Sequence, residues 1–358
     1  MKLNLSVGPV MMNKEIRKIG SDQIPYFRTE EFSSLMMENE QMLLKCLNAP
    51  EASRVIFLTA SGTAAMEATV INLFSDVDKL LVVNGGSFGK RFKEIVDIHG
   101  IQSEEIILSP YQPLKIEHLE RYNSEGFTGL LINAHETSTG VLYDMDMVGE
   151  FCKRNNILLV VDAISSFLAD SYDMSAYGAC ATILSSQKAI ALPPGMSFVA
   201  FDTKAQERLL KNRVKSLYFN FLNYLKEGER GQTPYTPAVS TLIQLNKQLK
   251  MIIEKGLDNI IKEVSYIAED FRKGIKLLPL EIESENLSNA LTPIKPIGNM
   301  GATQIVKILK DEYDIFVIPS GGELQECLFR VGHIGDLTLD DNKRLLTAFN
   351  ELNAKGIL

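Results

Sequence analysis

Short runs of apolar, often β-branched residues recur through the first two thirds of the chain, separated by polar and glycine-containing segments. Several runs are apolar at successive positions, as in LLVVD at 158–162. Such runs are typical of strands that are buried on both faces of a mainly parallel sheet. The pattern predicts strands at 55–59, 80–84, 106–109, 129–133, 157–162, 181–185 and 197–202.

Helical periodicity fills three of the intervals between these strands, near 63–74, 88–99 and 145–155. Alternation of strand and helix predicts an α/β layered domain. After Phe201 the pattern predicts a polar helical stretch at 204–226, a turn-rich segment at 228–237, and helices that begin near Ala238 and after Gly256. The rest of the chain predicts a smaller α+β domain, with strands at 281–285, 316–320 and 328–332 and helices near 303–313 and at the end.

Length, composition and charge narrow the class of protein. The length of 358 residues suits two domains, and a hydrophobic content of 45% is too high for a disordered chain. The 45 acidic and 37 basic residues give a net charge of −8, which argues against a nucleic-acid-binding protein. No apolar run suits a signal peptide or reaches the roughly 18 residues of a membrane-spanning helix, so we expect a cytoplasmic protein that is not bound to a membrane.

The cysteines are scattered and suggest no cross-link. None of the four forms a CxxC pair, which argues against structural zinc and against a disulfide framework. Their positions are Cys46, Cys152, Cys180 and Cys327.

Two charged residues stand at or just past the carboxyl ends of predicted buried strands. Lys188 lies in SSQKAIALPP, just past the carboxyl end of a strand, which is where α/β sheets bind ligands. An amine that is desolvated there has a lowered pKa and can attack carbonyl groups. The alternative for Lys188 is a solvated loop lysine. Asp162 closes an apolar strand, where a carboxylate needs a partner such as a pyridinium nitrogen, magnesium, an arginine or a helix N-terminus. The alternative for Asp162 is an N-cap of the next turn.

A third feature is the turn Ser61-Gly62-Thr63, which joins a predicted strand to an Ala-rich helix. Glycine permits close approach of the backbone, and the free N–H groups of a helix start offer a phosphate site. The turn matches neither GxxxxGK[ST] nor GxGxxG, and it could be a capped helix start alone. Taken in order, a phosphate turn, an acid for a pyridinium and a Schiff-base lysine describe pyridoxal 5′-phosphate.

On these residues the chain resembles the class V aminotransferases, in the branch of alanine–glyoxylate, serine–glyoxylate and 2-aminoethylphosphonate–pyruvate transaminases. The resemblance covers nearly the whole chain and implies the aspartate aminotransferase-like fold of pyridoxal-phosphate-dependent transferases. It implies an N-terminal segment 1–20 that contributes to the active site, a large cofactor-binding domain 21–250 and a small C-terminal domain 251–358. It rests on Gly8-Pro9, FRTEEF, SGT, NGGSFGKR, HETSTG, the Gln-Lys pair, TPYTP and FRVG.

The resemblance implies a role for each matching residue. Lys188 would hold the cofactor and move protons, beside Gln187, and Asp162 would pair with the ring nitrogen. Phe88 would stack on the ring, and Thr137 would reach the ring oxygen; core packing and a turn hydroxyl are the alternatives. The remaining implied contacts are Ser61, Gly62 and Thr63 with the phosphate, Thr236 with the neighbouring subunit's phosphate, Arg330 with the substrate carboxylate, and Arg28 with the substrate or the dimer interface.

The implied activity is a two-step transamination in a homodimer with composite active sites. The amino donor would be alanine, serine or 2-aminoethylphosphonate, and the acceptor would be glyoxylate or pyruvate. The segment FRVGHIG resembles the phosphonate enzymes and SSQKAIALPPG resembles the glyoxylate enzymes, so the donor stays open.

Two other functions compete with transamination for the same fold. A cysteine desulfurase would have His where this chain has Gln187, and Cys327 is predicted on one strand with Arg330, facing the opposite side. A non-catalytic cofactor-binding regulator would need an appended DNA-binding segment, and the sequence shows no such segment.

Overall fold

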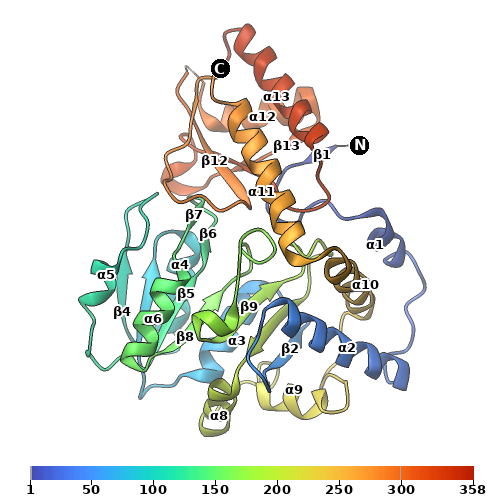
Figure 1. Ribbon diagram of the computed structural model, residues 1–358, viewed down its shortest axis with the longest axis vertical. Coiled ribbons are helices and arrows are strands. Elements are labelled where there is room, and N and C mark those ends of the chain that lie inside the picture. Colours follow the sequence, from blue (N-terminus) through green and yellow to red (C-terminus); the bar gives the residue numbers. More distant parts are fainter. Residues whose placement is uncertain (1, 299) are drawn as a thin grey trace.

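A seven-stranded sheet forms the centre of the larger of two units in the computed structural model, which describes residues 2–298 and 300–358 (Figure 1). Its strands follow the order β2-β10-β9-β8-β5-β3-β4, and β10 alone runs antiparallel to its neighbours. The strands are β2 (Arg54–Leu58), β3 (Lys79–Asn84), β4 (Gln102–Ile107), β5 (Gly129–Asn133), β8 (Leu158–Asp162), β9 (Ala179–Ser185) and β10 (Ser197–Phe201). The predicted α/β class with a mainly parallel sheet is confirmed.

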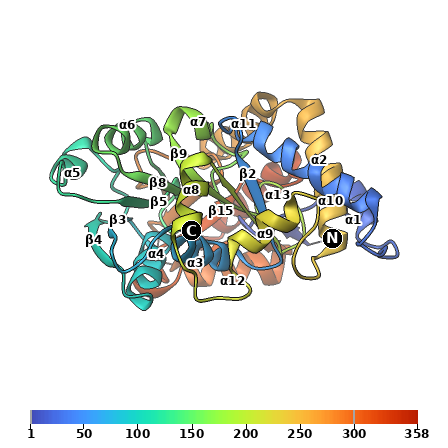
Figure 2. The same cartoon turned by 90° about the horizontal axis from the view of Figure 1, so that it is seen from below.

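Helices cover both faces of this sheet, and Figure 2 shows the sheet between two helical layers. Two separate apolar cores result, because strands such as β5 are buried over their whole length and need cover on each side. One face carries α1 (Lys14–Ile19), α2 (Glu30–Cys46), α5 (Ile116–Glu120), α6 (Met145–Asn155), α7 (Met174–Tyr177) and α10 (Val239–Lys255). The other face carries α3 (Gly62–Leu73), α4 (Ser87–Ile98), α8 (Thr203–Lys211) and α9 (Phe221–Gly228).

The smaller unit contains both ends of the chain and has its own apolar core (Figure 1). An antiparallel sheet of order β11-β12-β15-β14 lies beside a parallel pair of β1 and β13. The strands are β1 (Leu3–Asn4), β11 (Leu280–Glu281), β12 (Leu291–Pro296), β13 (Ile315–Phe316), β14 (Ile318–Pro319) and β15 (Phe329–Gly332). The helices are α11 (Leu257–Gly274), α12 (Ala302–Tyr313), η1 (Gly322–Leu324) and α13 (Leu339–Ala354). The hairpin of β6 (His135–Glu136) and β7 (Val141–Leu142) completes the fold.

The junction of α10 and α11 marks the passage from one unit to the other. Helix α10 packs against α1 and α2, whereas α11 packs against α13. Gly256, at a φ of 85°, separates the two helices. The expected division at residue 250 falls inside α10, so we propose that the physical boundary lies at Gly256.

Several expected elements differ in the structure. The stretch 204–226 is two helices rather than one, because Asn212 leaves the helical path and its amide donates to the carbonyls of Ile71, Asn72 and Phe74. Strand β4 begins at Gln102, earlier than the expected 106, because an edge strand tolerates exposed polar residues at alternate positions.

The small sheet also departs from the expectation. The stretch 281–285 is a strand only to Glu281, while β12 was missed because its two prolines argue against a central strand. The stretch 316–320 contributes to two sheets, through β13 and β14. Cys327 precedes β15 in a turn and is exposed, so the argument that placed it on one strand with Arg330 was wrong.

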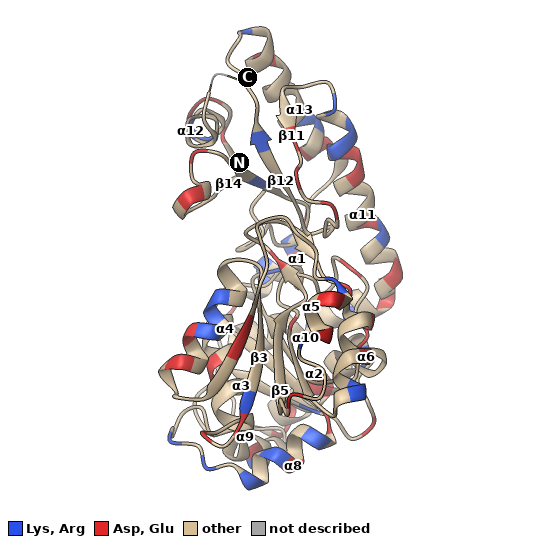
Figure 3. Ribbon diagram, turned by 90° about the vertical axis from the view of Figure 1, so that its left-hand side faces the viewer, with Lys and Arg blue, Asp and Glu red and all other residues tan. Residues whose placement is uncertain are grey.

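Charged residues occur along the helices of both units, among them α8 of the larger unit and α11 and α13 of the smaller one (Figure 3). Within the described residues, no helix is both long enough and apolar enough to cross a membrane.

Candidate active site

A narrow pocket opens at the carboxyl ends of β5, β8 and β9, and it brings together residues from segments far apart in the sequence. Its lining includes a buried amine, a buried carboxylate, an aromatic ring and a hydroxyl group. The lining residues are Phe88, His135, Thr137, Asp162, Ile164, Ser165 and Lys188. Four of the predicted site residues therefore share one pocket.

The two charged groups of this pocket have shifted pKa values. Burial lowers the pKa of Lys188 to about 8, against the opposing charge of Asp162, and the positive charge of Arg330 lowers it further. Burial raises the pKa of Asp162 to about 6, although a hydrogen bond from the Ile164 N–H (2.9 Å) and the charge of Lys188 act the other way. Burial therefore brings the pKa of Lys188 much closer to neutral pH than that of an exposed lysine, and it favours a cationic partner for the carboxylate of Asp162.

His135 lines the same pocket but is not an acid or base at neutral pH. Burial lowers its pKa to about 3, and neither ring nitrogen has a hydrogen-bond partner in the described chain. Buried polar groups normally have hydrogen-bond partners, so the two free ring nitrogens of His135 indicate that a bound molecule supplies a partner in this pocket.

The N-terminal segment packs against Lys188. The N–H of Val10 donates to the carbonyl of Gln187 (3.2 Å), and a Cβ placed on Gly8 would lie 2.7 Å from Cδ of Lys188. The same segment joins the small unit, since the N–H of Gly332 donates to the carbonyl of Leu5 (2.7 Å). The lysine is thus held between the large sheet and a strap from the small unit.

The turn at 61–63 begins α3, as the sequence predicted. Ser61 caps the helix by accepting a hydrogen bond from the Ala64 N–H (3.3 Å). A Cβ on Gly62 would lie 2.5 Å from Cδ1 of Ile164, so the glycine is needed where the turn approaches the pocket. Thr63 is exposed, and its hydroxyl accepts a hydrogen bond from Nη1 of Arg91 (3.3 Å).

Arg330, on β15 of the small unit, does not line the pocket itself but contacts Thr137, which does. Its Nη1 donates to the carbonyl of Thr137 (2.8 Å) and its Nη2 to the carbonyl of Pro319 (2.8 Å), while its Nε is buried without a partner. The guanidinium therefore keeps a buried Nε–H group without a partner, and the side chain of Arg330 as a whole is only partly exposed.

Gln187 lies next to Lys188 and Thr236 lies outside the pocket. The side-chain oxygen of Gln187 accepts a hydrogen bond from the Ser185 hydroxyl (2.6 Å). Thr236 is exposed on a turn whose neighbour Ala238 donates its N–H to Oγ1 of Thr59 (3.0 Å), close in sequence to the turn at 61–63.

Arg28 does not line the pocket. Its Nη1 donates to the side chain of Gln232 (3.1 Å) and to the carbonyl of Thr233 (2.9 Å). Arg28 thereby fixes the turn that carries Thr236, an arrangement that neither expected role described.

The sequence missed Ile164 and Ser165 of the pocket lining, and it also missed two residues that contact the predicted site residues, Arg91 and Glu136. The guanidinium of Arg91 lies over the Phe88 ring, 4.8 Å from its centre, and beside Thr63. Glu136 is fully buried and binds the backbone of α4. Both lie within the quoted motifs NGGSFGKR and HETSTG, but nothing in a motif shows which side chains turn inward.

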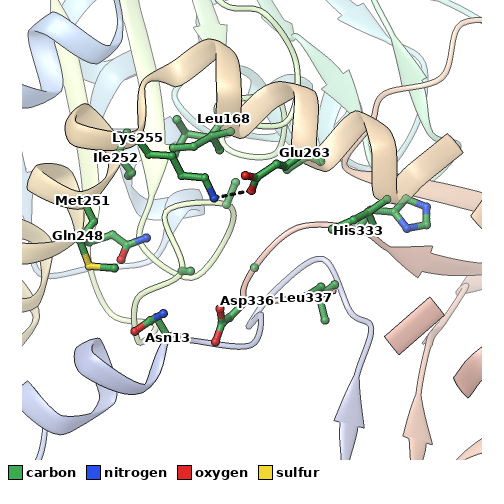
Figure 4. Close-up of a pocket in the computed structure, with 16 residues that line it drawn as sticks. Asn13, Leu168, Gln248, Met251, Ile252, Lys255, Glu263, His333, Asp336 and Leu337 are labelled. Carbon is green, nitrogen blue, oxygen red and sulfur yellow. Dashed lines mark hydrogen bonds and ion pairs between the residues drawn. The ribbon is translucent and has the colours of Figure 1, made fainter. Parts of the chain in front are cut away.

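A second pocket lies behind the loop that follows Lys188 (Figure 4). Ala189 and Ala191 of that loop line it, whereas Lys188 and Asp162 do not. The ion pair of Lys255 and Glu263 spans the helices above it. Since this pocket contains neither the buried amine nor the buried carboxylate, the narrow pocket is the candidate active site.

Comparison with known proteins agrees with this architecture. The family model of class-V aminotransferases matches residues 25–325, so the chain belongs to that family. The family consists of pyridoxal-phosphate-dependent enzymes, and the chain is a transaminase of this class.

Individual relatives span most of the chain. It is 33% identical over 315 residues to the soluble hydrogenase 42 kDa subunit of Anabaena cylindrica, covering 86% of this chain and 82% of the relative. It is 26% identical over 361 residues to alanine–glyoxylate aminotransferase of Mus musculus, covering 98% and 87%. The structure of a subgroup IV aspartate aminotransferase from Thermus thermophilus superposes with a TM-score of 0.91 at 24% identity, covering 99% of each chain.

The residues of the narrow pocket fit the family's cofactor. An aldehyde reacts with a neutral amine, and the lowered pKa of Lys188 would make that form accessible. A protonated pyridine nitrogen would suit the buried carboxylate of Asp162. The glycine of the 61–63 turn leaves space at the start of α3, where a phosphate binds favourably.

Proposed function

We propose that this chain transfers an amino group from a small amino donor to a 2-oxo acid, with pyridoxal 5′-phosphate held covalently by Lys188. The observation that carries the proposal is the meeting of a buried amine with a pKa of about 8 and a buried carboxylate in one pocket of a class V aminotransferase. When bound, the cofactor supplies an electron sink for the substrate's Cα.

The cofactor contacts proposed for this chain come from four segments. Ser61, Gly62 and Thr63 would bind the phosphate through the first N–H groups of α3, and Arg91 adds a positive charge beside Thr63. Phe88 would stack on the ring, and the Thr137 hydroxyl would reach the ring oxygen, since both side chains line the pocket. Gln187 would complete the contacts beside Lys188.

Protons are moved by Lys188 and held by Asp162. The neutral amine of Lys188 would take the proton from the donor's Cα and return one on the way to the oxo product. Asp162 would keep a proton on the ring nitrogen, because a buried carboxylate with a raised pKa is stabilised by a cationic neighbour. In the second half-reaction, on the 2-oxo acid, Lys188 and Asp162 would have the same roles in the reverse direction.

Arg330 would hold the substrate carboxylate. Its planar guanidinium still offers a buried Nε–H, and an arginine suits a carboxylate because its donors are arranged as a fork. Alanine, serine or 2-aminoethylphosphonate remain the proposed donors, and glyoxylate or pyruvate the proposed acceptors. The name of the mouse relative supports alanine and glyoxylate among these.

We also propose a homodimer with composite active sites. Thr236 is exposed on a turn that Arg28 fixes, so its hydroxyl is available to a second copy of the chain. The four cysteines are all free thiols, which supports a cytoplasmic location.

Reduction with borohydride tests the covalent link. Protein loaded with the cofactor should be yellow, lose its visible absorbance on reduction, and carry the label on Lys188. Incubation with each donor should then identify the one that bleaches the unreduced protein. A label on any other lysine, with Lys188 unmodified, would contradict the assignment.

A further inference from the structure

Glu136 is a carboxylate with no exposed surface, and both of its oxygens accept hydrogen bonds. Its Oε2 accepts from the N–H groups of Phe88 (3.2 Å) and Gly89 (3.3 Å) and from the side-chain amide of Asn133 (3.2 Å). Its Oε1 accepts from the N–H (3.1 Å) and the hydroxyl (2.6 Å) of Ser138. Five donors on two oxygens leave little freedom for the side chain.

These bonds complete the first turn of α4. The N-cap residue Gly86 has no side chain to satisfy the free N–H groups of the helix. Glu136 takes two of them, and the Ser138 hydroxyl accepts the third from Ser87 (3.2 Å). A Cβ on Gly86 would lie 2.7 Å from Cδ of Glu136, so the glycine is what permits this approach.

The same carboxylate fixes the loop on its own side. Thr137 stands between Glu136 and Ser138, whose positions these hydrogen bonds determine. The carbonyl of Thr137 in turn accepts Nη1 of Arg330 (2.8 Å). One buried side chain therefore connects the backbone of Phe88, the backbone of Thr137 and, through it, the guanidinium of Arg330.

We propose that Glu136 is the positioning residue that holds Phe88, Thr137 and Arg330 in register around the cofactor and the substrate carboxylate. It contacts neither group itself and acts through the residues that do. The inference rests on the proposed function, because it assigns Phe88 to the ring, Thr137 to the ring oxygen and Arg330 to the substrate. A helix cap that only stabilises the fold is the competing explanation.

The test compares Glu136→Gln with Asp170→Asn, each loaded with pyridoxal phosphate. Gln keeps the shape but turns one acceptor into a donor facing N–H groups. Asp170 is an equally buried carboxylate that accepts from the Asn289 N–H (2.8 Å) and contacts none of the pocket residues. Thermal unfolding without cofactor, cofactor affinity, circular dichroism of the bound cofactor, and KM for the 2-oxo acid are measured for both.

Both variants should lose thermal stability, but only Glu136→Gln should change the cofactor. Its cofactor affinity should fall by about tenfold or more, as expected when hydrogen bonds to a buried charged group are lost. The circular dichroism of the bound cofactor should weaken, and KM for the oxo acid should rise. Glu136→Asp, which keeps an acceptor pair, should restore part of each. Affinity, dichroism and KM equal to those of Asp170→Asn would overturn the proposal.

A milder variant covers the case in which Glu136→Gln does not fold. Ser138→Ala removes one donor to Glu136 and the acceptor of the Ser87 N–H, and it should shift the dichroism in the same direction. No shift with Ser138→Ala would then overturn the proposal. Failure of the proposed function is recognised separately, because the wild-type chain itself would then show no covalent cofactor.

Discussion

Gly8 and Lys188 are in contact: a Cβ on Gly8 would lie 2.7 Å from Cδ and 3.0 Å from Cε of the lysine. Gly8 also has a φ of 140°, which residues with a side chain rarely adopt. The N-terminal strap thus approaches the reactive amine as closely as the backbone allows.

Gly8→Ala should displace the lysine chain and slow capture of the cofactor by about tenfold or more, since a misplaced reacting group loses rate steeply. Stopped-flow absorbance would measure the capture rate. Gly195→Ala is the matched control, because Gly195 has a φ of 121° but nothing within 4 Å of its missing Cβ. Equal slowing in both variants would mean that backbone strain, and not contact with Lys188, is responsible.

Capture of the cofactor should depend on pH with a midpoint near 8. The neutral amine is the reactive form, and burial lowers the pKa of Lys188 to about 8, so the rate should rise through pH 8 and level off above about 9. Between pH 8 and 10.5 the unfolded chain binds more protons at this position, so the apoprotein should gain stability as pH rises. Exposed lysines labelled in the same sample provide the reference, and a midpoint near 10.5 would contradict the prediction.

Asp162→Asn should lose orders of magnitude in turnover and yet gain stability as apoprotein. Burial raises the pKa of Asp162 from 3.8 to about 6, so the folded chain binds more protons between these values, and stability falls as pH rises through them. Above pH 6 the buried, ionised Asp162 lowers the free energy of unfolding by its full amount, at most about 3 kcal/mol. The uncharged Asn side chain of the variant causes no such loss. Denaturant unfolding at pH 7.5 and pH 4 would show the difference, which should vanish at the lower pH.

Thr236→Ala should leave a dimer but weaken its hold on the cofactor phosphate. The side chain of Thr236 is exposed in a single copy of the chain. In the proposed dimer its hydroxyl would contact the phosphate of the cofactor bound to the other copy. Analytical ultracentrifugation would measure the mass, and absorbance titration the affinity. Thr203→Ala, at an exposed threonine of α8, is the control. A fully active monomer would refute composite sites, and unchanged affinity would remove only Thr236 from them.

The buried parts of the fold could be predicted from the sequence because two-sided burial demands unbroken apolar runs. Strands β5 and β8 lie within a residue of their expected bounds. Strand β4, at the sheet edge, and β12, with its prolines, lack that signature and were misplaced or missed. The positions of Lys188 and Asp162 at strand ends made them candidates, but a loop lysine and an N-cap stayed open until the three features were taken together with the family resemblance. The structure places both side chains in one pocket.

What the sequence by itself determined is therefore the layered fold, its family and the two charged groups at the strand ends. Only the tertiary structure decided which residues meet them. Glu136 and Phe88 are 48 positions apart, and Arg330 and Thr137 are 193 apart. In each of these pairs one partner is a backbone N–H or carbonyl group. Nearly every residue of the chain carries such groups, so the sequence does not single out the ones that take part. The positions of helix starts and loops in the folded chain decide which backbone groups lack a partner within their own element and face a buried side chain.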